Sequence, residues 1–289
     1  MAFSVNTNAG AMAALQSLNA TNRSMETTQA RITTGLNVAS TKDDSAKYTV
    51  AQTLRGDLGK LNAVTSSLNN AKSVTDVAVA GGEQISDLLN QMKSKTLEAS
   101  DAGLDVESRT AISKDLVSLK KQINTIIDGS DFNGVNLLKD GGTTDGAVSA
   151  LQSISSDETL SIANQGYTTK ATTAFGDSTD DATITALAGT DSAAAATAAS
   201  DLSATLDTFF DEVKTSLSEL GAGSRQIDGQ LAFNSNLTDV VTTGIGSLVD
   251  ADLAKESANL QALQVQQQLG VQALSIANQA PQTLLSLFQ

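Results

Sequence analysis

Two pairs of adjacent aspartates are the first residues of this sequence that could take part in chemistry. Asp43-Asp44 and Asp180-Asp181 supply carboxylates, which bind Ca²⁺ or act as general acids and bases. Acidic residues are also favoured in the first turn of a helix, so a helix start with Thr41 or Asp43 as its cap explains the first pair better. The second pair lies in a polar stretch rich in Gly, Ser and Thr, which favours a solvated loop over a metal or catalytic site.

Gly81-Gly82 are the third candidate, for a phosphate-binding loop. They lie inside a long helical pattern with no strand before them, so a close approach of two helices explains them better. The sequence has no histidine and no cysteine, which excludes Ser/His/Asp and Cys/His catalysis and thiolate zinc sites. An enzyme that used carboxylates alone still fits the composition, but no spacing brings such groups together. We therefore expect no enzyme activity, no cofactor and no metal.

The composition indicates an elongated helical protein. The 289 residues suffice for one large or two small domains, yet only 3% are aromatic and tryptophan is absent. A net charge of -14 disfavours binding to nucleic acid or to an anionic membrane surface. The start of the sequence lacks the charged and apolar regions of a cleavable signal peptide, and no apolar run is long enough to span a membrane.

The end of the sequence, residues 252–289, predicts one long helix with an apolar stripe. Its apolar residues recur in steps of four, four and three, an 11-residue repeat of about 3.67 residues per turn that keeps the stripe nearly straight. A second line at Leu263, Leu274 and Leu285 widens it. The repeat consists of Ala254, Ala258, Ala262, Val265, Leu269, Ala273, Ile276, Ala280, Leu284 and Leu287. Such a stripe needs a covering partner, and a core within the same chain is the simplest one.

A second end helix is predicted over residues 8–36. One face of this helix carries Leu15, Leu18, Met25, Ile32 and Leu36. Asn22 and Gln29 interrupt that face, so the stripe is weak for an isolated helix. Like the last helix, the first one should therefore need a partner to fold.

Between the two ends, the pattern predicts long helical rods. Residues 45–100 carry apolar side chains at steps of three and four with no proline, and residues 105–128 carry a second such pattern. The short loop between them predicts an antiparallel helical hairpin. Phe132-Asn133-Gly134 then predicts a turn. A helical pattern returns at residue 193 and continues toward the end helix.

A polar insert interrupts the rods. Residues 141–192 are rich in Gly, Ser, Thr, Ala and Asp, with short alternating pieces at residues 159–163 and 183–185. This pattern predicts a small β-rich or irregular insert with a polar surface. The fold class is therefore mainly α, with long antiparallel helical rods and a small β-rich or irregular central insert.

Three separated motifs resemble those of the bacterial flagellins. The first is residues 31–46, with Arg-Ile-Thr-Thr-Gly-Leu followed by Lys-Asp-Asp; the second is Asp131-Phe132-Asn133-Gly134 followed by Leu137-Leu138. The third is residues 273–288, from Ala-Leu-Ser-Ile-Ala-Asn-Gln-Ala-Pro-Gln to Leu-Leu-Ser-Leu-Phe. The resemblance covers residues 1–139 and 200–289, and residues 248–274 are most similar to flagellins of alphaproteobacteria.

The resemblance implies three structural parts. Residues 1–40 and 252–289 would pair as a coiled coil that lines the inner tube of a filament. Residues 41–140 with 193–251 would form a helical rod domain, and residues 141–192 would form a variable insert that faces solvent. The assembly interface would include Leu15, Leu18, Met25, Ile32, Val265, Leu269, Ile276, Leu284, Leu287 and Phe288.

The resemblance also implies a function and partners. The chain would be a structural subunit that assembles with copies of itself into the extracellular flagellar filament for swimming. The flagellar type III system would export it without cleavage, a chaperone would hold its C-terminal helix, and cap and hook-junction proteins would be further partners. It would bind neither nucleic acid nor membrane.

Two further expectations depend on where the chain departs from its relatives. The patch that innate immune receptors read in many flagellins aligns with Lys93-Ser94-Lys95, where it is degenerate, so we expect weak receptor activation. The Ser and Thr content of the insert permits O-glycosylation.

Two alternatives share some of these features. A hook-filament junction protein has similar end helices without indefinite polymerisation, but the density of flagellin motifs argues against it. A soluble coiled-coil signalling or effector protein would show similar rods, but it would not need an uncovered apolar end helix.

Overall fold

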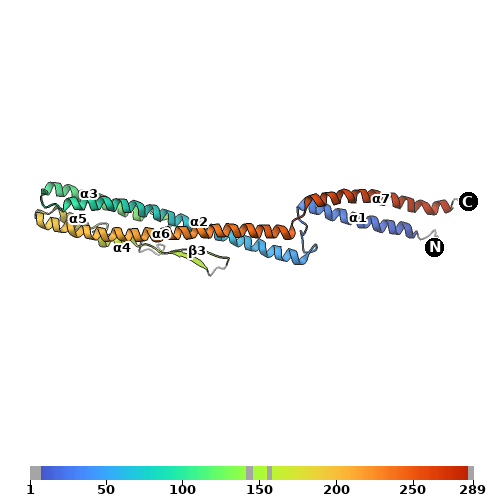
Figure 1. Cartoon of the computed structure of the whole chain (residues 1–289), viewed down its shortest axis with the longest axis horizontal. Helices are drawn as coiled ribbons and strands as arrows, with labels where there is room; N and C mark the ends of the chain where they lie inside the picture. The colour runs from blue at the N-terminus through green and yellow to red at the C-terminus, as the bar shows by residue number, and fades with distance from the viewer. Residues whose placement is uncertain (1–7, 141–145, 155–157, 286–289) are drawn as a thin grey trace. The chain divides into compact units, whose positions relative to one another are not determined.

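The computed structural model describes residues 8–140, 146–154 and 158–285, and it describes the side chains of the last helix as far as Gln279. Within these residues the protein is mainly α, as predicted, with two small antiparallel sheets (Figure 1). The chain divides into two compact units. Unit 1 combines Met1–Leu58 with Asp239–Gln289, and unit 2 is Gly59–Thr238.

Long helices account for most of the described chain. They are α1 (Ala9–Thr34), α2 (Ser45–Ala99), α3 (Val106–Gly129), α6 (Ser192–Val249) and α7 (Leu253–Leu285). The shorter elements are β1 (Asp131–Phe132), β2 (Val135–Asn136), β3 (Val148–Leu151), β4 (Thr159–Ile162), α4 (Tyr167–Phe175), α5 (Ala182–Thr185) and the 3₁₀ helix η1 (Ala186–Ala188). The helix bounds agree with the predicted periodic segments within a few residues.

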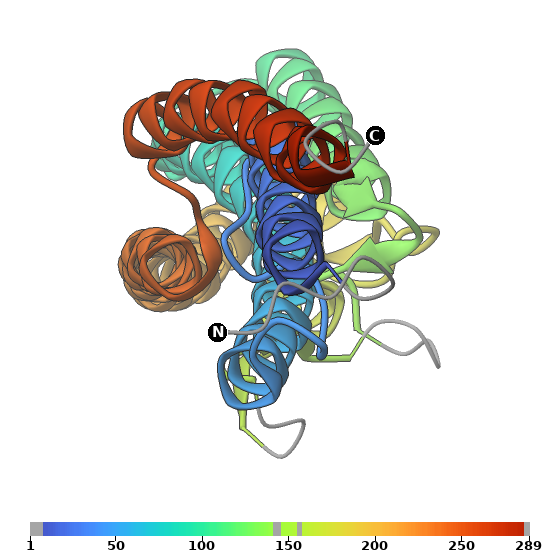
Figure 2. The ribbon, with the colours of Figure 1, turned by 90° about the vertical axis from the view of Figure 1, so that its right-hand side faces the viewer.

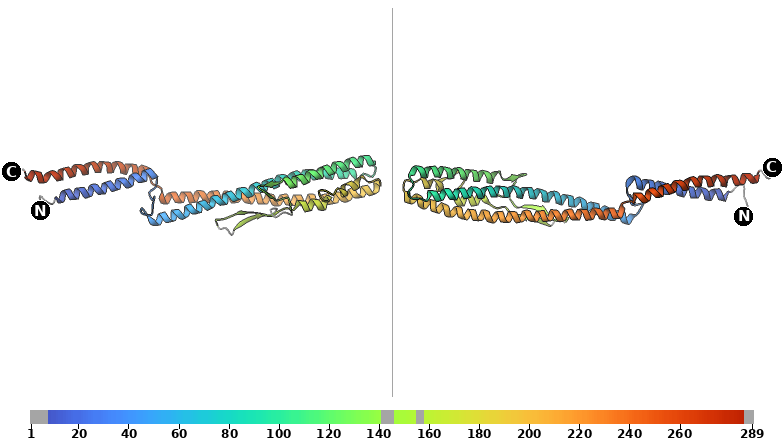
Figure 3. Two further views of the ribbon diagram at one scale, coloured as in Figure 1. Left: turned by 180° about the vertical axis from the view of Figure 1, so that it is seen from behind. Right: turned by 45° about the horizontal axis from the view of Figure 1, so that its top comes forward.

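Unit 2 is built on the helical hairpin that the sequence predicts. The side chain of Asp105 accepts a hydrogen bond from the Ser108 amide at 2.8 Å and so starts α3. Lys95 of α2 lies 3.9 Å from the Asp115 carboxylate of α3, as expected where the two helices run antiparallel. The α6 helix continues alongside them, and both views in Figure 3 show these long helices side by side in unit 2.

The glycine pair of α2 marks close contacts between elements. A Cβ atom at Gly81 would lie 2.3 Å from the Ser130 hydroxyl, and one at Gly82 would lie 2.9 Å from a methyl group of Leu217. Neither position has room for a larger side chain without movement of its neighbours. Close packing therefore explains the pair, in agreement with the prediction.

A small aromatic cluster forms part of the core of unit 2. The ring of Phe209 on α6 meets Tyr167 edge to face at 6.1 Å and Phe175 at 5.9 Å between centroids. All three side chains are almost completely buried. Few aromatic residues are thus enough to fill this part of the core, because α4 places two of them against one face of α6.

The predicted turn connects the two strands of the first small sheet. β1 and β2 pair antiparallel through two residues, Asn133 with φ 53° and Gly134 with φ 78°. Both residues have positive φ, which is the requirement of the tight hairpin turn that Asn-Gly favours. The predicted turn at residues 132–134 is confirmed.

The second hairpin, β3 with β4, lies in the insert (Figure 3). Its side chains alternate, with Val148, Ala150, Leu160 and Ile162 buried. Contacts with both long helices fix it: the Leu151 amide donates to the Ser67 hydroxyl at 3.1 Å, and the side chain of Gln230 donates to the Gln152 carbonyl at 2.6 Å. The strand predicted at residues 159–163 is therefore confirmed as β4.

The alternating piece at residues 183–185 is helical instead of extended. Asp180 accepts a hydrogen bond from the Ala182 amide at 2.9 Å and so favours a helical start. Ile184 and Leu187, three residues apart, are both completely buried in the core of unit 2. Burial at helical spacing outweighs the strand preference of Thr and Ile here. The insert consequently holds α4, α5 and η1 besides its hairpin.

Candidate assembly surface

The two end helices, α1 and α7, pack against each other in unit 1 (Figures 1 and 2). Near the beginning of α1, the side chain of Asn8 donates to the Ala277 carbonyl at 2.7 Å. Further along, the side-chain amide of Gln267 donates to Asn22 at 2.8 Å. Later positions in α1 thus meet earlier positions in α7, so the pair is antiparallel.

The contact between the two helices combines leucines with small and polar residues. A Cβ atom at Gly270 would lie 3.3 Å from a methyl group of Leu18, which shows how closely the backbones approach. The half-buried or buried positions of α7 recur in steps of four and three, which is a seven-residue pattern. These positions are Glu256, Leu260, Leu263, Gln267, Gly270, Leu274 and Ala277.

The 11-residue apolar stripe of α7 lies on a different face and is uncovered in a single copy. Val265 is 55% exposed, Leu269 57% and Ile276 69%. At about 100° per residue, this stripe lies far around the helix from the line that faces α1. The α7 helix therefore carries two patterns: a seven-residue one that meets α1 and an 11-residue one that meets nothing in this chain among the described residues.

Three of the four predicted interface residues of α1 face α7, and the fourth is exposed. Leu18, Met25 and Ile32 are half-buried at seven-residue spacing, and Leu18 reaches Gly270 of α7. Leu15 is 48% exposed and lies outside this line.

The last three predicted interface residues lie at or beyond the end of α7. Leu284 lies within the helix, in the part where side chains are not described. Leu287 and Phe288 lie outside the described residues.

The segment between α1 and α2 binds the start of the chain to the end of α6. Gly35, with φ 72°, ends α1, and its carbonyl accepts from the Ala251 amide at 2.9 Å. The amides of Asn37 and Val38 both donate to the Val249 carbonyl. These backbone hydrogen bonds join residues 35–38 to residues 249–251 within unit 1.

The first aspartate pair is structural. Asp44 caps α2 by accepting from the Ala46 amide at 3.0 Å and the Lys47 amide at 3.1 Å, so the cap is Asp44, not the predicted Thr41 or Asp43. Asp43 instead accepts from the backbone and hydroxyl of Ser40. Those hydrogen bonds, the backbone one first, hold the pKa of the Asp43 carboxyl below its ordinary value. Over the described residues, no cluster of three acidic side chains could hold a metal.

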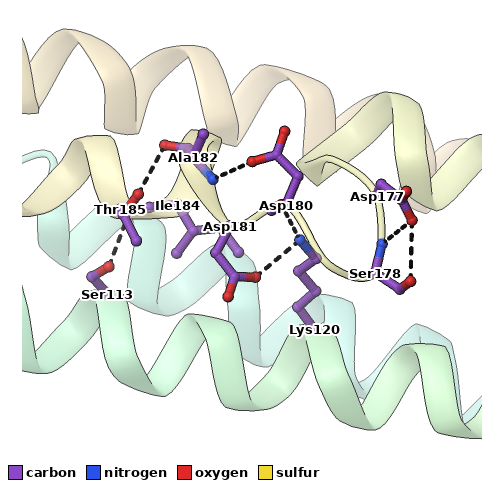
Figure 4. Close-up of polar contacts among 9 residues, drawn as sticks. All are labelled: Ser113, Lys120, Asp177, Ser178, Asp180, Asp181, Ala182, Ile184 and Thr185. Carbon is purple, nitrogen blue, oxygen red and sulfur yellow. Dashed lines mark hydrogen bonds and ion pairs between the residues drawn. The ribbon is translucent and has the colours of Figure 1, made fainter.

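The second aspartate pair holds the insert to α3 (Figure 4). The completely buried Lys120 donates through Nζ to the Asp180 carbonyl at 2.5 Å and to the Asp181 carboxylate at 3.1 Å. On the same helix, Ser113 donates to the Ile184 carbonyl at 3.1 Å (Figure 4), and the guanidinium group of Arg109 donates to the Gly189 carbonyl at 3.2 Å. The pair is therefore more than a solvated loop, because it joins the insert to α3.

Sequence reasoning missed the buried cation of this contact, although a signal was present. Lys120 follows Leu116 by four residues and precedes Ile123 by three, so it lies on the apolar face of its helix. A lysine at such a position needs a buried partner. The partner, 60 residues further along the chain, could not be identified from spacing.

The predicted receptor patch lies on α2. The ammonium group of Lys93 pairs with Asp207 at 2.5 Å and lies 4.7 Å from the centre of the Phe210 ring. Lys95 pairs with Glu98 at 3.3 Å, and Ser94 is exposed. Both lysines thus have partners within the chain.

These features define a class of protein. Unit 2 has a closed core, whereas the helix pair of unit 1 leaves a regular apolar stripe uncovered, which is typical of a structural subunit that other chains complete. In the part of the chain that the structure describes, no helix has both the length and the apolar character of a membrane span.

Comparison with known proteins identifies the family. The model of the bacterial flagellin N-terminal helical region matches residues 5–143, and that of the C-terminal helical region matches residues 203–288. Flagellin FljK of Caulobacter vibrioides is 42% identical, with 99% of this chain and 98% of that protein covered. A flagellin of Brucella melitensis is 38% identical and flagellin C of Rhizobium meliloti 34%, each with 99% of both chains covered.

The chain belongs to the bacterial flagellins, the structural subunits that polymerise into the extracellular flagellar filament. The similarity to alphaproteobacterial flagellins predicted from the sequence is confirmed. The family is structural and not enzymatic, in agreement with the prediction.

Proposed function

We propose that copies of this chain polymerise through the outer stripe of α7, with the α1–α7 pair as the unit that associates. The observation that carries the proposal is the exposure of Val265, Leu269 and Ile276, which is 55%, 57% and 69%. Complete burial of one such side chain contributes about 1.5–3 kcal/mol, so a stripe of them favours association strongly. Because the 11-residue repeat keeps the stripe nearly straight, a neighbouring helix can follow it over many turns.

The same proposal assigns roles in the filament to the three predicted parts. Residues 1–40 with 252–289 line the inner tube, and Leu15, Leu18, Met25 and Ile32 contribute to its contacts together with the α7 stripe and Leu284, Leu287 and Phe288. Residues 41–140 with 193–251 form the rod domain, and residues 141–192 form the insert, whose outer side faces solvent while residues such as Tyr167 and Ile184 are buried in the core of unit 2. Two features support this division: residues 1–22 and 257–289 carry no charged side chain, and the hairpin of the insert exposes the polar Ser149, Thr159 and Ser161.

Before assembly, the uncovered stripe requires protection. An apolar surface of this kind favours unwanted association in the cytosol. An export chaperone that holds the C-terminal helix, type III export, and cap and hook-junction proteins at the growing filament fit this requirement. Binding of a flagellar chaperone to the full chain and its loss on truncation at Asp250 would test the first of these partners.

The receptor patch and the insert give two finer proposals. The lysines at positions 93 and 95 replace the expected patch residues and are engaged by Asp207 and Glu98, which supports weak activation of immune receptors. A strong response of reporter cells to purified monomer contradicts this. The Ser and Thr side chains of the insert are proposed to carry O-linked sugars, and an intact mass equal to that of the bare sequence would remove that proposal.

The polymerisation proposal is tested by seeded growth. Purified chain is added to short wild-type filament seeds, and growth is followed by negative-stain electron microscopy. The double variant L269S/I276S should not elongate the seeds, whereas Q264S, an exposed polar position on another face of α7, should elongate them normally. Normal growth of the double variant contradicts the proposed role of the stripe.

A further inference from the structure

The hairpin turn between β1 and β2 holds a chemically labile dipeptide. Asn133-Gly134 is the only place in the sequence where glycine follows asparagine. Glycine has no Cβ atom, so its backbone nitrogen reaches the preceding side chain more easily than that of any other residue. Both residues are exposed, and a Cβ atom at Gly134 would have no atom of the described residues within 4 Å. Water and solvent base therefore have free access to this peptide bond.

The reaction that this dipeptide favours is deamidation through a cyclic imide. The backbone nitrogen of Gly134 loses its proton to solvent base and attacks Cγ of the Asn133 side chain. A bond forms between this nitrogen and Cγ, the Cγ–Nδ2 bond breaks, and Nδ2 takes up a proton from solvent and leaves as ammonia. Water then opens the five-membered ring and gives aspartate or isoaspartate at position 133. The net change consumes one water, releases one ammonia and adds one negative charge.

The folded turn prevents closure of this ring. The φ angles of Asn133 and Gly134 are 53° and 78°. They are those of a type I′ turn, which sets ψ of its first central residue to about 30°. At this ψ, Cβ of Asn133 and the nitrogen of Gly134 lie about 150° apart around the Cα–C bond, whereas a planar five-membered ring requires them almost eclipsed. The attacking nitrogen and Cγ therefore meet only if the turn opens.

The residues that follow the turn keep it closed. Asn136 of β2 is buried, and its side chain donates to the Ile127 carbonyl of α3 at 2.7 Å. The oxygen of the same side chain accepts from the amide of Leu138, which is completely buried, at 2.8 Å. Opening the turn disturbs these buried contacts, so the open state should be rare in the folded chain.

We propose that Asn133 is a site of spontaneous deamidation that reacts in the unfolded chain and is protected by the folded turn. Folding does not reverse the modification, because the ammonia has been lost. Each chain thus carries a permanent record of the time that it has spent unfolded. The inference concerns a single chain and does not depend on the proposed polymerisation.

The test compares the full chain folded in buffer with the full chain unfolded in guanidinium chloride, at the same mildly alkaline pH and the same temperature. The tryptic peptide of residues 122–139 contains Asn133 together with two internal controls, Asn124 and Asn136, which precede Thr125 and Leu137. Mass spectrometry measures the conversion from amide to acid at each asparagine over time. A sample digested at the start gives the conversion that digestion itself causes.

Deamidation of Asn133 should be at least about tenfold faster in the unfolded chain than in the folded one, because the turn must open first. Asn124 and Asn136 should stay almost unmodified in both samples, since larger side chains follow them. Equal rates at Asn133 in the two samples overturn the protection by the turn. No measurable reaction in the unfolded chain overturns the site itself.

A matched pair of variants tests the attacking nitrogen in guanidinium chloride, where no variant needs to fold. G134A should slow the reaction at Asn133 at least about tenfold, because a methyl group obstructs the nitrogen. G129A changes another glycine of the same peptide and should leave the rate unchanged. A G134A rate equal to that of the wild type, or an equal decrease in G129A, overturns the inference.

Discussion

The two units of this protein contrast in how they use apolar residues. Unit 2 buries a continuous core that includes Tyr167, Phe175 and Phe209, and it fixes its insert through the buried Lys120. In unit 1 the end helices meet mainly through half-buried residues, while the apolar stripe with Leu269 and Ile276 remains exposed. The comparison indicates that unit 2 is complete as a single copy, whereas the helix pair of unit 1 is completed by neighbouring subunits.

The largest difference is expected from matched truncations in the two units. Phe209→Ala removes a completely buried ring and should lower the free energy of unfolding by about 3–5 kcal/mol. Leu18→Ala removes a half-buried side chain from the helix pair and should change the monomer by less than about 1 kcal/mol. Urea unfolding followed by circular dichroism measures both. Equal losses would show that the end helices belong to the same cooperative unit as the core.

The buried lysine should have the next largest effect. Lys120→Met leaves the Asp180 carbonyl and the Asp181 carboxylate without their donor and should cost about 2 kcal/mol, since the carboxylate remains partly solvated. Lys121→Met, at the exposed neighbouring position, serves as the control and should be neutral. Unfolding midpoints of the two variants provide the measurement. An unchanged midpoint for Lys120→Met contradicts the role given to this contact.

High pH should weaken unit 2 through Tyr167. Burial raises the pKa of this phenol to about 12, above the value near 10 expected in the unfolded chain. Its contribution is therefore complete below about pH 10 and is lost as the pH rises toward 12, by up to roughly 2 kcal/mol. Tyr167→Phe should change stability by less than about 1 kcal/mol at pH 7 and should remove this part of the loss. Identical pH profiles for the two proteins would contradict the assignment.

The smallest expected effect concerns charge. The net charge of -14 lies outside the uncharged end segments, residues 1–22 and 257–289, so subunits repel one another through the rest of the chain. Salt screens such repulsion, and the seeded elongation rate should rise from low to moderate ionic strength. Elongation rates that do not change with salt would show that the charges are already compensated in the filament.

Periodicity predicted the long helices well, because apolar residues at steps of three and four recur over many turns. It could not predict which face of α7 meets α1, since two apolar patterns share that helix. Leu263 and Leu274 of the minor line face inward, whereas the major stripe with Leu269 stays outside. The choice depends on Gly270, which permits close approach to Leu18, and that is a property of the pair rather than of either sequence.

Contacts between distant segments could not be predicted from the sequence either. Asp181 is held by Lys120, and α5 forms because Ile184 finds a buried position in the core of unit 2. Local propensity favoured a strand at residues 183–185, and tertiary packing decided otherwise. The Asn133-Gly134 turn was predictable because its backbone requirement is local.

Hydrogen exchange of monomer and filament, resolved by mass spectrometry, tests the central claim most directly. Amides of α1 and α7 should exchange rapidly in the monomer and slowly in the filament, while the core helices of unit 2 should be protected in both. Strong protection of α7 in the monomer, or exchange that stays rapid in the filament, would contradict the conclusion that neighbouring subunits complete unit 1.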